Sequence, residues 1–123
     1  MSTVQLRVPA DPEFVGLLRN NAMAIAAHTQ LTLETIADLQ LGIGEAFSLV
    51  IAHRPTTGDV VTDFVLVDGG LDVVVTGPAG GTLPLVDDWA MMILDTVSTD
   101  PELTVNADGQ VTVTLHSRVV TSA

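Results

Sequence analysis

The chain has 123 residues, 47% of them hydrophobic, and this size and composition suit a single folded domain spanning residues 1–123. Its net charge is −11 without any lysine, so we expect no nucleic-acid partner, because phosphate binding needs a basic surface. The lack of cysteine excludes disulfides and thiolate metal sites. No apolar run approaches the ~20 residues that span a bilayer and no signal peptide opens the chain, so we expect a cytoplasmic protein without a membrane partner.

The first half of the sequence predicts one strand and two helices. Alternating apolar and polar side chains after the N-terminus are typical of a half-buried strand. Asp11 and Thr32 are suited to cap the two helices that follow them. Gly42 and Gly44 each cost the second helix about 1 kcal/mol relative to alanine, but the apolar periodicity around them favours a continuous helix. These patterns predict a strand over 4–8 and helices over about 11–28 and 33–53.

The second half predicts two hairpins with a helix between them. Two valine-rich segments are joined by Asp-Gly-Gly at 68–70, which is a hairpin signal. In the helix we expect Met91 and Met92 to fill the core, although a protein interface is an alternative for these flexible side chains. The predicted ranges are strands over 60–67, 71–76, 103–105 and 111–116, and a helix over about 86–98. One sheet would bury all the apolar stripes together, so we predict an α+β two-layer sandwich with a mixed, mostly antiparallel sheet and three helices on one face.

Residues 45–53 carry the most informative motif. They read Glu-Ala-Phe-Ser-Leu-Val-Ile-Ala-His, which resembles the E-A-x-x-N-x-x-x-H signature of the anti-sigma factor serine kinases. The predicted order of strands and helices is similar to that family as well, which implies the histidine-kinase-like (GHKL, or Bergerat) ATPase fold. In the family the Asn holds magnesium and the Glu is the general base. Here Glu45 is present, but Leu49 stands at the Asn position and has no oxygen with which to bind a hard cation.

The two glycine-rich nucleotide boxes of that family also differ here. Residues 76–81 read Thr-Gly-Pro-Ala-Gly-Gly where the family has D-x-G-x-G. Thr76 therefore stands at the position of the adenine-reading Asp, and Gly77 and Gly80 are what remains of the box. Where a second box should open the next helix, residues 87–92 begin with two aspartates, which would repel phosphate. Few residues are left between the boxes for the lid that covers ATP in the family. The resemblance thus implies a nucleotide site that has degenerated.

We therefore expect a binding protein that uses no ATP or magnesium. The resemblance implies a homodimer that sequesters a sigma factor and exchanges it for an anti-anti-sigma antagonist, with Arg19 contacting the partner. The acidic surface favours a basic protein partner, although solubility alone also explains it. One alternative is a divergent serine kinase that binds ATP through substitute residues, with Glu45 as base. For His53 we favour a role at the helix end over catalysis or metal binding. A purely structural module is the remaining hypothesis.

Overall fold

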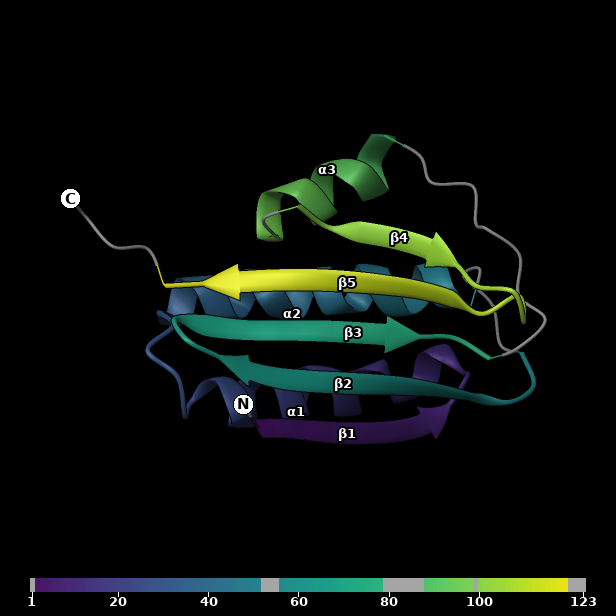
Figure 1. Ribbon diagram of the computed structural model, residues 1–123, viewed down its shortest axis with the longest axis horizontal. Helices are drawn as coiled ribbons and strands as arrows, with labels where there is room; N and C mark the ends of the chain where they lie inside the picture. Colours follow the sequence, from purple (N-terminus) through teal and green to yellow (C-terminus); the bar gives the residue numbers. More distant parts are fainter. Residues whose placement is uncertain (1, 52–55, 79–87, 99, 120–123) are drawn as a thin grey trace.

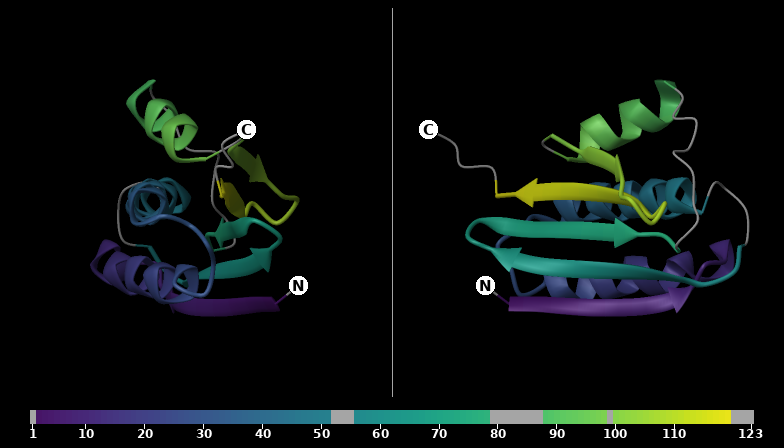
Figure 2. Two further views of the ribbon diagram at one scale, coloured as in Figure 1. Left: turned by 90° about the vertical axis from the view of Figure 1, so that its left-hand side faces the viewer. Right: turned by 45° about the vertical axis from the view of Figure 1, so that its right-hand side comes forward.

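The computed structural model describes residues 2–51, 56–78, 88–98 and 100–119, and these form two layers. Helices α1, α2 and α3 lie side by side on one face of a single twisted sheet (Figures 1 and 2), and no helix of the described ranges covers the opposite face. The elements in chain order are β1 (Ser2–Pro9), a 3₁₀ turn (Pro12–Phe14), α1 (Val15–Ala26), α2 (Leu33–Val50), β2 (Asp59–Val67), β3 (Gly70–Thr76), α3 (Asp88–Val97), β4 (Glu102–Val105) and β5 (Val111–Arg118). The predicted order and the α+β fold class are confirmed.

The sheet is antiparallel at every strand pair of the described residues. Its strand order is β1-β2-β3-β5-β4, so β3 lies at the centre and the short β4 at one edge. The expected mixture of parallel and antiparallel strands is therefore absent from this part of the chain. Side chains of β3 and β5 alternate between buried and half-buried along each strand, which separates a face towards the helices from an open face.

Both predicted helix caps are confirmed. The Asp11 side chain accepts a hydrogen bond from the Glu13 backbone N–H at 2.9 Å, and the Thr32 hydroxyl accepts one from the Thr35 N–H at 3.1 Å. The first cap begins a 3₁₀ turn rather than an α-helix, and α1 starts only at Val15, later than the predicted residue 11. Such caps satisfy backbone donors that a helix start would otherwise leave unpaired.

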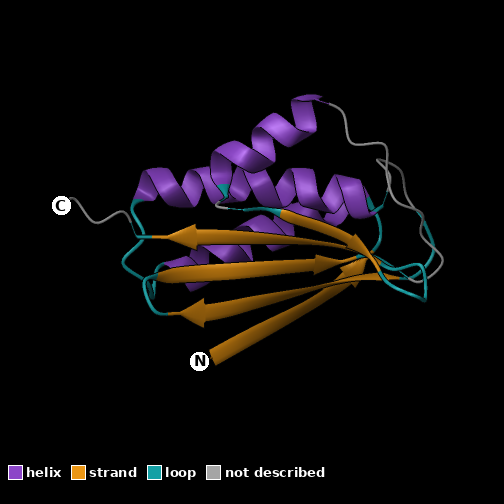
Figure 3. Cartoon of the chain, turned by 45° about the horizontal axis from the view of Figure 1, so that its top comes forward, coloured by secondary structure: helices purple, strands orange, loops and turns teal. Residues whose placement is uncertain are grey.

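Helix α2 is the central helix and forms much of the core. It lies between α1 and α3 and packs on β3 and β5 (Figure 3). Gly42 and Gly44 lie inside it, as predicted, and both are buried. A methyl group on Gly42 would overlap the Val97 side chain of α3, so the missing side chain lets α2 and α3 approach closely.

The expectation that two methionines of α3 fill the core is wrong. Met91 and Met92 are 39% and 52% exposed. The buried residues of this helix recur at the spacing of one helix face, and both methionines fall outside that stripe. The buried set is Ala90, Ile93, Leu94 and Val97.

No helix within the described ranges is both long and apolar enough to cross a membrane.

Candidate functional site

The residues singled out by the kinase resemblance gather at one end of the domain. The C-terminal turns of α2, which carry Glu45 and Leu49, lie at the same end as the C-terminal end of β3 with Thr76 and Gly77 (Figure 1). The fold therefore brings the first glycine box against the helix that bears the Glu-Ala motif. His53, Gly80 and Asp87 lie outside the described residues.

Leu49 is a core residue. Its side chain is 1% exposed and belongs to the cluster that fills the space between helices and sheet. The apolar environment suits leucine, whose full burial contributes about 1.5–3 kcal/mol. A magnesium ligand at this position would have to be an oxygen atom, and Leu49 offers none.

The first glycine box packs directly on α2. A side chain added to Gly77 would lie 2.6 Å from the Val50 carbonyl oxygen, closer than atoms can approach. Gly77 is also held by its N–H, which donates to the Val111 carbonyl at 2.8 Å. Gly77 therefore lets the end of β3 lie against the last turn of α2, a close approach that residues with side chains would prevent.

Thr76 lies on the open face of the sheet. It is half-buried, and its hydroxyl lies 3.3 Å from the hydroxyl of Thr112 on the neighbouring strand. The adjacent Val75 is fully buried towards the helices, and strand alternation turns Thr76 the other way. After β3, the next residue that faces the helices is therefore Gly77, which has no side chain that could hydrogen-bond to an adenine base. Counting the alternation along the strand would have revealed this from the sequence.

Arg19 on α1 lies across α2 at Gly44, the residue before Glu45. Glu45 is half-buried on α2, and Arg19 is exposed on α1. The Arg19 guanidinium lies across the neighbouring Gly44, where a methyl group would overlap it. The two helices are also joined by a hydrogen bond of 3.0 Å from the Gln40 side chain to the Arg19 carbonyl. Glycine at position 44 therefore makes room for a cation on the outer surface of the helix layer.

An ionic cluster on the open face was not predicted from the sequence. The Asp72 carboxylate accepts from Arg118 at 2.7 Å and lies 2.9 Å from the His116 ring. Burial raises the pKa of Asp72, but hydrogen bonds from Arg118 and His116 outweigh this, so that the pKa lies below its usual value. The other ring nitrogen of His116 is 3.4 Å from Glu102 on β4. These residues come from the neighbouring strands β3, β5 and β4. The register between the strands brings them together, and it cannot be predicted from the sequence of each strand alone.

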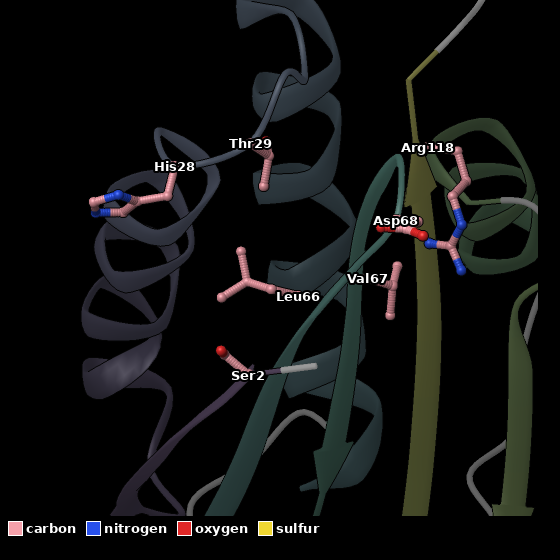
Figure 4. Close-up of a pocket in the computed structure, with 7 residues that line it drawn as sticks. All are labelled: Ser2, His28, Thr29, Leu66, Val67, Asp68 and Arg118. Atoms are coloured by element: carbon pink, nitrogen blue, oxygen red, sulfur yellow. The ribbon is translucent and has the colours of Figure 1, made fainter.

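Two pockets outside this region are also formed by described residues. One lies where the β2–β3 hairpin meets the turn after α1, and Figure 4 shows its residues as sticks, among them His28, Asp68 and Arg118. Its lining has both signs of charge, which favours no particular ligand. The other lies between α2, α3 and β5. Within the described part of the chain, His, Asp and Glu side chains form no group of three or more that could hold a metal ion.

Comparison with known proteins gives a consistent set of relatives. The chain is 26% identical to a serine-protein kinase RsbW of Bacillus pumilus over 82 residues, which are 63% of this chain and 51% of the relative. It is 29% identical to the Bacillus subtilis serine-protein kinase RsbW over 75 residues, or 58% and 47% of the two chains. For that of Halalkalibacterium halodurans the identity is 28% over 101 residues, or 69% and 62%. The chain thus spans about half the length of most of these curated relatives, and no family model matches it.

A solved structure shares the fold. The crystal structure of the RsbU and RsbW domains of Rv1364c from Mycobacterium tuberculosis superimposes with a TM-score of 0.75 at 16% identity, covering 100% of this chain and 34% of that one. At this identity the likeness concerns the fold alone. Together with the sequence relatives, it confirms the resemblance to the anti-sigma factor serine kinases of the GHKL group.

Proposed function

We propose that this chain is an anti-sigma-factor-like regulator that acts by protein binding without ATP. In this proposal it sequesters a sigma factor in the cytoplasm and releases it when an anti-anti-sigma antagonist competes for an overlapping surface. The resting form is a homodimer, and Arg19, exposed on α1, contributes to the partner surface. The domain is a pseudokinase that keeps the fold of its relatives and has lost their nucleotide chemistry.

The burial of Leu49 is the observation that carries this proposal. The side chain at the position of the magnesium-binding Asn is 1% exposed and packed in the core. An ion bridging nucleotide phosphates needs oxygen ligands and space, and this position supplies neither. Magnesium also neutralises phosphate charge, so its loss removes a main source of triphosphate affinity.

The end of β3 supports the same conclusion. The helix-facing position there is Gly77, and Thr76 makes its side-chain contact with Thr112 on the open face. A carboxylate that hydrogen-bonds an adenine amino group is therefore missing from both positions. The loss of such a hydrogen bond costs roughly 1–3 kcal/mol of specific binding. Glu45 keeps the place of the general base, but without magnesium and phosphate it has no group to activate.

Calorimetric titration of ATP and ADP with magnesium tests the nucleotide half of this proposal. With the protein at ~100 µM, affinities in the sub-millimolar range produce measurable heat. We expect no heat and no thermal stabilisation. A matched titration with a catalytically active serine-protein kinase RsbW serves as the positive control. Magnesium-dependent binding to this chain would overturn the pseudokinase hypothesis.

Binding to purified sigma factors of the source organism tests the partner half. We expect one of them to form a complex without nucleotide, and an anti-anti-sigma protein to displace it. The Arg19→Ala variant should weaken this complex while leaving the unfolding midpoint unchanged, because the side chain is exposed. If no sigma factor binds with or without ATP, the sequestering function is wrong.

The second candidate is a divergent ATP-dependent serine kinase that phosphorylates the anti-anti-sigma factor. The names of the sequence relatives favour it, since the proteins of Bacillus pumilus, Bacillus subtilis and Halalkalibacterium halodurans are all serine-protein kinases. The retained Glu45 favours it as well. This hypothesis requires ATP and magnesium. It predicts transfer of labelled phosphate to a serine of the antagonist, abolished by Glu45→Gln.

A further inference from the structure

A pocket of about 360 Å³ lies at the end of the domain opposite Leu49. Its walls are the first turns of α2, the last turn of α3 and the C-terminal end of β5. The distance along α2 from Asp38 to Leu49 is roughly 16 Å at 1.5 Å per residue. The pocket is therefore separate from the region of the kinase-like motif, and Figure 1 shows that the start of α2, the end of α3 and the end of β5 lie at the same end of the domain.

Two carboxylates in this pocket lack a counter-charge. Asp38 on α2 is half-buried, and Asp95 on α3 is exposed. Neither forms an ion pair with another described residue. Asp95 belongs to the last turn of α3, which carries no basic residue. Since the C-terminal end of a helix has partial negative charge, this carboxylate adds to the dipole instead of compensating it. Two carboxylates without an ion pair favour a cation as the ligand.

Cationic side chains that border the pocket are already engaged elsewhere. The Arg118 guanidinium donates to Asp72 on the open face at 2.7 Å, and the ring of His116 contacts the same carboxylate at 2.9 Å. At the N-terminal end of α2, whose dipole is positive, the Thr35 N–H is satisfied by the Thr32 hydroxyl at 3.1 Å. These contacts leave the charge of Asp38 and Asp95 uncompensated within the described residues.

A buried hydroxyl at the pocket supplies an independent observation. Ser117 lines the pocket and is 3% exposed, and its hydroxyl has no hydrogen-bond partner among the described residues. It stands on the helix-facing side of β5, as Leu115 and Val113 do, so its side chain is directed towards α2 and α3. Most buried hydroxyls in proteins are paired, because an unpaired one loses its hydrogen bonds to water without replacement. The free hydroxyl can accept from an N–H or donate to an oxygen, and beside two carboxylates the compatible ligand is one with N–H donors.

We propose that this pocket binds the guanidinium group of an arginine from a protein partner. The inference rests on the proposed function, in which the chain acts by protein contacts. Guanidinium is more weakly hydrated than ammonium and offers several donors in one plane, which suits a partly buried site with two carboxylates and a hydroxyl. Asp38 and Asp95 neutralise its charge, and Ser117 accepts one of its N–H groups.

The test uses N-acetyl-arginine amide as probe and amide NMR shifts of the ¹⁵N-labelled chain as readout. We expect millimolar binding, with the largest shifts at Asp38, Asp95 and Ser117. The uncharged N-acetyl-citrulline amide should give at least about fivefold smaller affinity, because it has similar shape without the charge. Equal binding of the citrulline probe, equal binding of magnesium chloride at the same residues, or shifts spread over the whole surface would each overturn the proposal.

Two variants address the residues directly. Asp38→Asn combined with Asp95→Asn should weaken probe binding by about five- to tenfold. The control, Asp63→Asn combined with Asp108→Asn, removes the same charge from strand β2 and the β4–β5 turn and should have no such effect. If both pairs weaken binding equally, only net charge matters and the site is refuted.

Ser117→Ala provides a measurement that does not depend on charge. Because the hydroxyl has no partner in the free protein, its removal should leave stability unchanged or raise it, while probe affinity falls about threefold. Unchanged probe affinity together with lower stability would show a structural hydroxyl instead of a ligand contact.

Binding of the partner separates this inference from the proposed function. A sigma factor that binds the wild type and the Asp38→Asn, Asp95→Asn variant equally would leave the proposed function standing and refute the role of the pocket in it. If the arginine probe binds as expected but no sigma factor does, the proposed function fails and the guanidinium site remains.

Discussion

Replacing Leu49 with asparagine should destabilise the fold instead of creating a magnesium site. Leu49 is 1% exposed, so the exchange forfeits most of the transfer free energy of a buried leucine, about 1.5–3 kcal/mol. It also buries an amide without a partner, which costs a further 1–3 kcal/mol or so. The expected loss is therefore about 2.5–6 kcal/mol. At roughly 3–5 °C per kcal/mol for a domain of this size, the unfolding midpoint should fall by about 8–30 °C.

Urea unfolding measures this loss, and calorimetry with magnesium and ATP measures any gain of function in the same preparation. Leu49→Met is the matched control, since it conserves volume and should cost less than about 1.5 kcal/mol. If the Leu49→Asn variant were as stable as the wild type, the side chain at this position would have access to polar groups or water. The assignment of Leu49 to the core would then be wrong. If the same variant also bound magnesium-ATP, the degenerate-site hypothesis would fall with it.

Three further predictions concern the packing of α2 and the ion cluster on the open face. Gly42→Ala should destabilise by up to about 2 kcal/mol in urea unfolding, because displacing Val97 costs more than the roughly 1 kcal/mol of helix propensity gained. Gly44→Ala should be neutral or stabilise by up to about 1 kcal/mol, since only the flexible end of Arg19 must move. Asp72→Asn should destabilise at pH 6. The pKa of Asp72 is below the ordinary 3.8 in the folded state, so its contribution to folding stability is present above pH 3.8 and is lost as the pH falls through the folded pKa. In an acid titration the unfolding free energies of the variant and the wild type should therefore converge below pH 3.8.

Strong local signals made most of the fold predictable from the sequence. The caps at Asp11 and Thr32, the Asp-Gly-Gly hairpin and the alternating strands each fix structure over a few residues, and the structure confirms all of them. Helix α3 was less predictable. Its sequence is apolar on more than one face, so the positions of Met91 and Met92 depended on which face meets the sheet, and this is decided by tertiary packing.

The candidate sites were harder to predict because they depend on contacts between distant segments. The motif at Glu45 is recognisable in the sequence itself, and so is the presence of Leu49 where the motif has Asn. That Gly77 packs against Val50 depends on where β3 ends relative to α2, which no spacing in the sequence states. The cluster around Asp72 likewise depends on the register between β3 and β5.

Under the proposed function the two ends of α2 have different roles. At the C-terminal end Leu49 contributes to the core, at the position where the kinase resemblance places a magnesium-binding Asn. At the N-terminal end Asp38 remains uncompensated and the Ser117 hydroxyl unpaired among the described residues, which a core selected for stability alone would remove. Buried polar atoms without a partner also occur at Asn21 and Thr62 among the described residues, and Ser117 differs from them in lining a pocket. In our proposal the domain acts by binding a basic partner, and the carboxylates and hydroxyl of this pocket are the groups that would contact it.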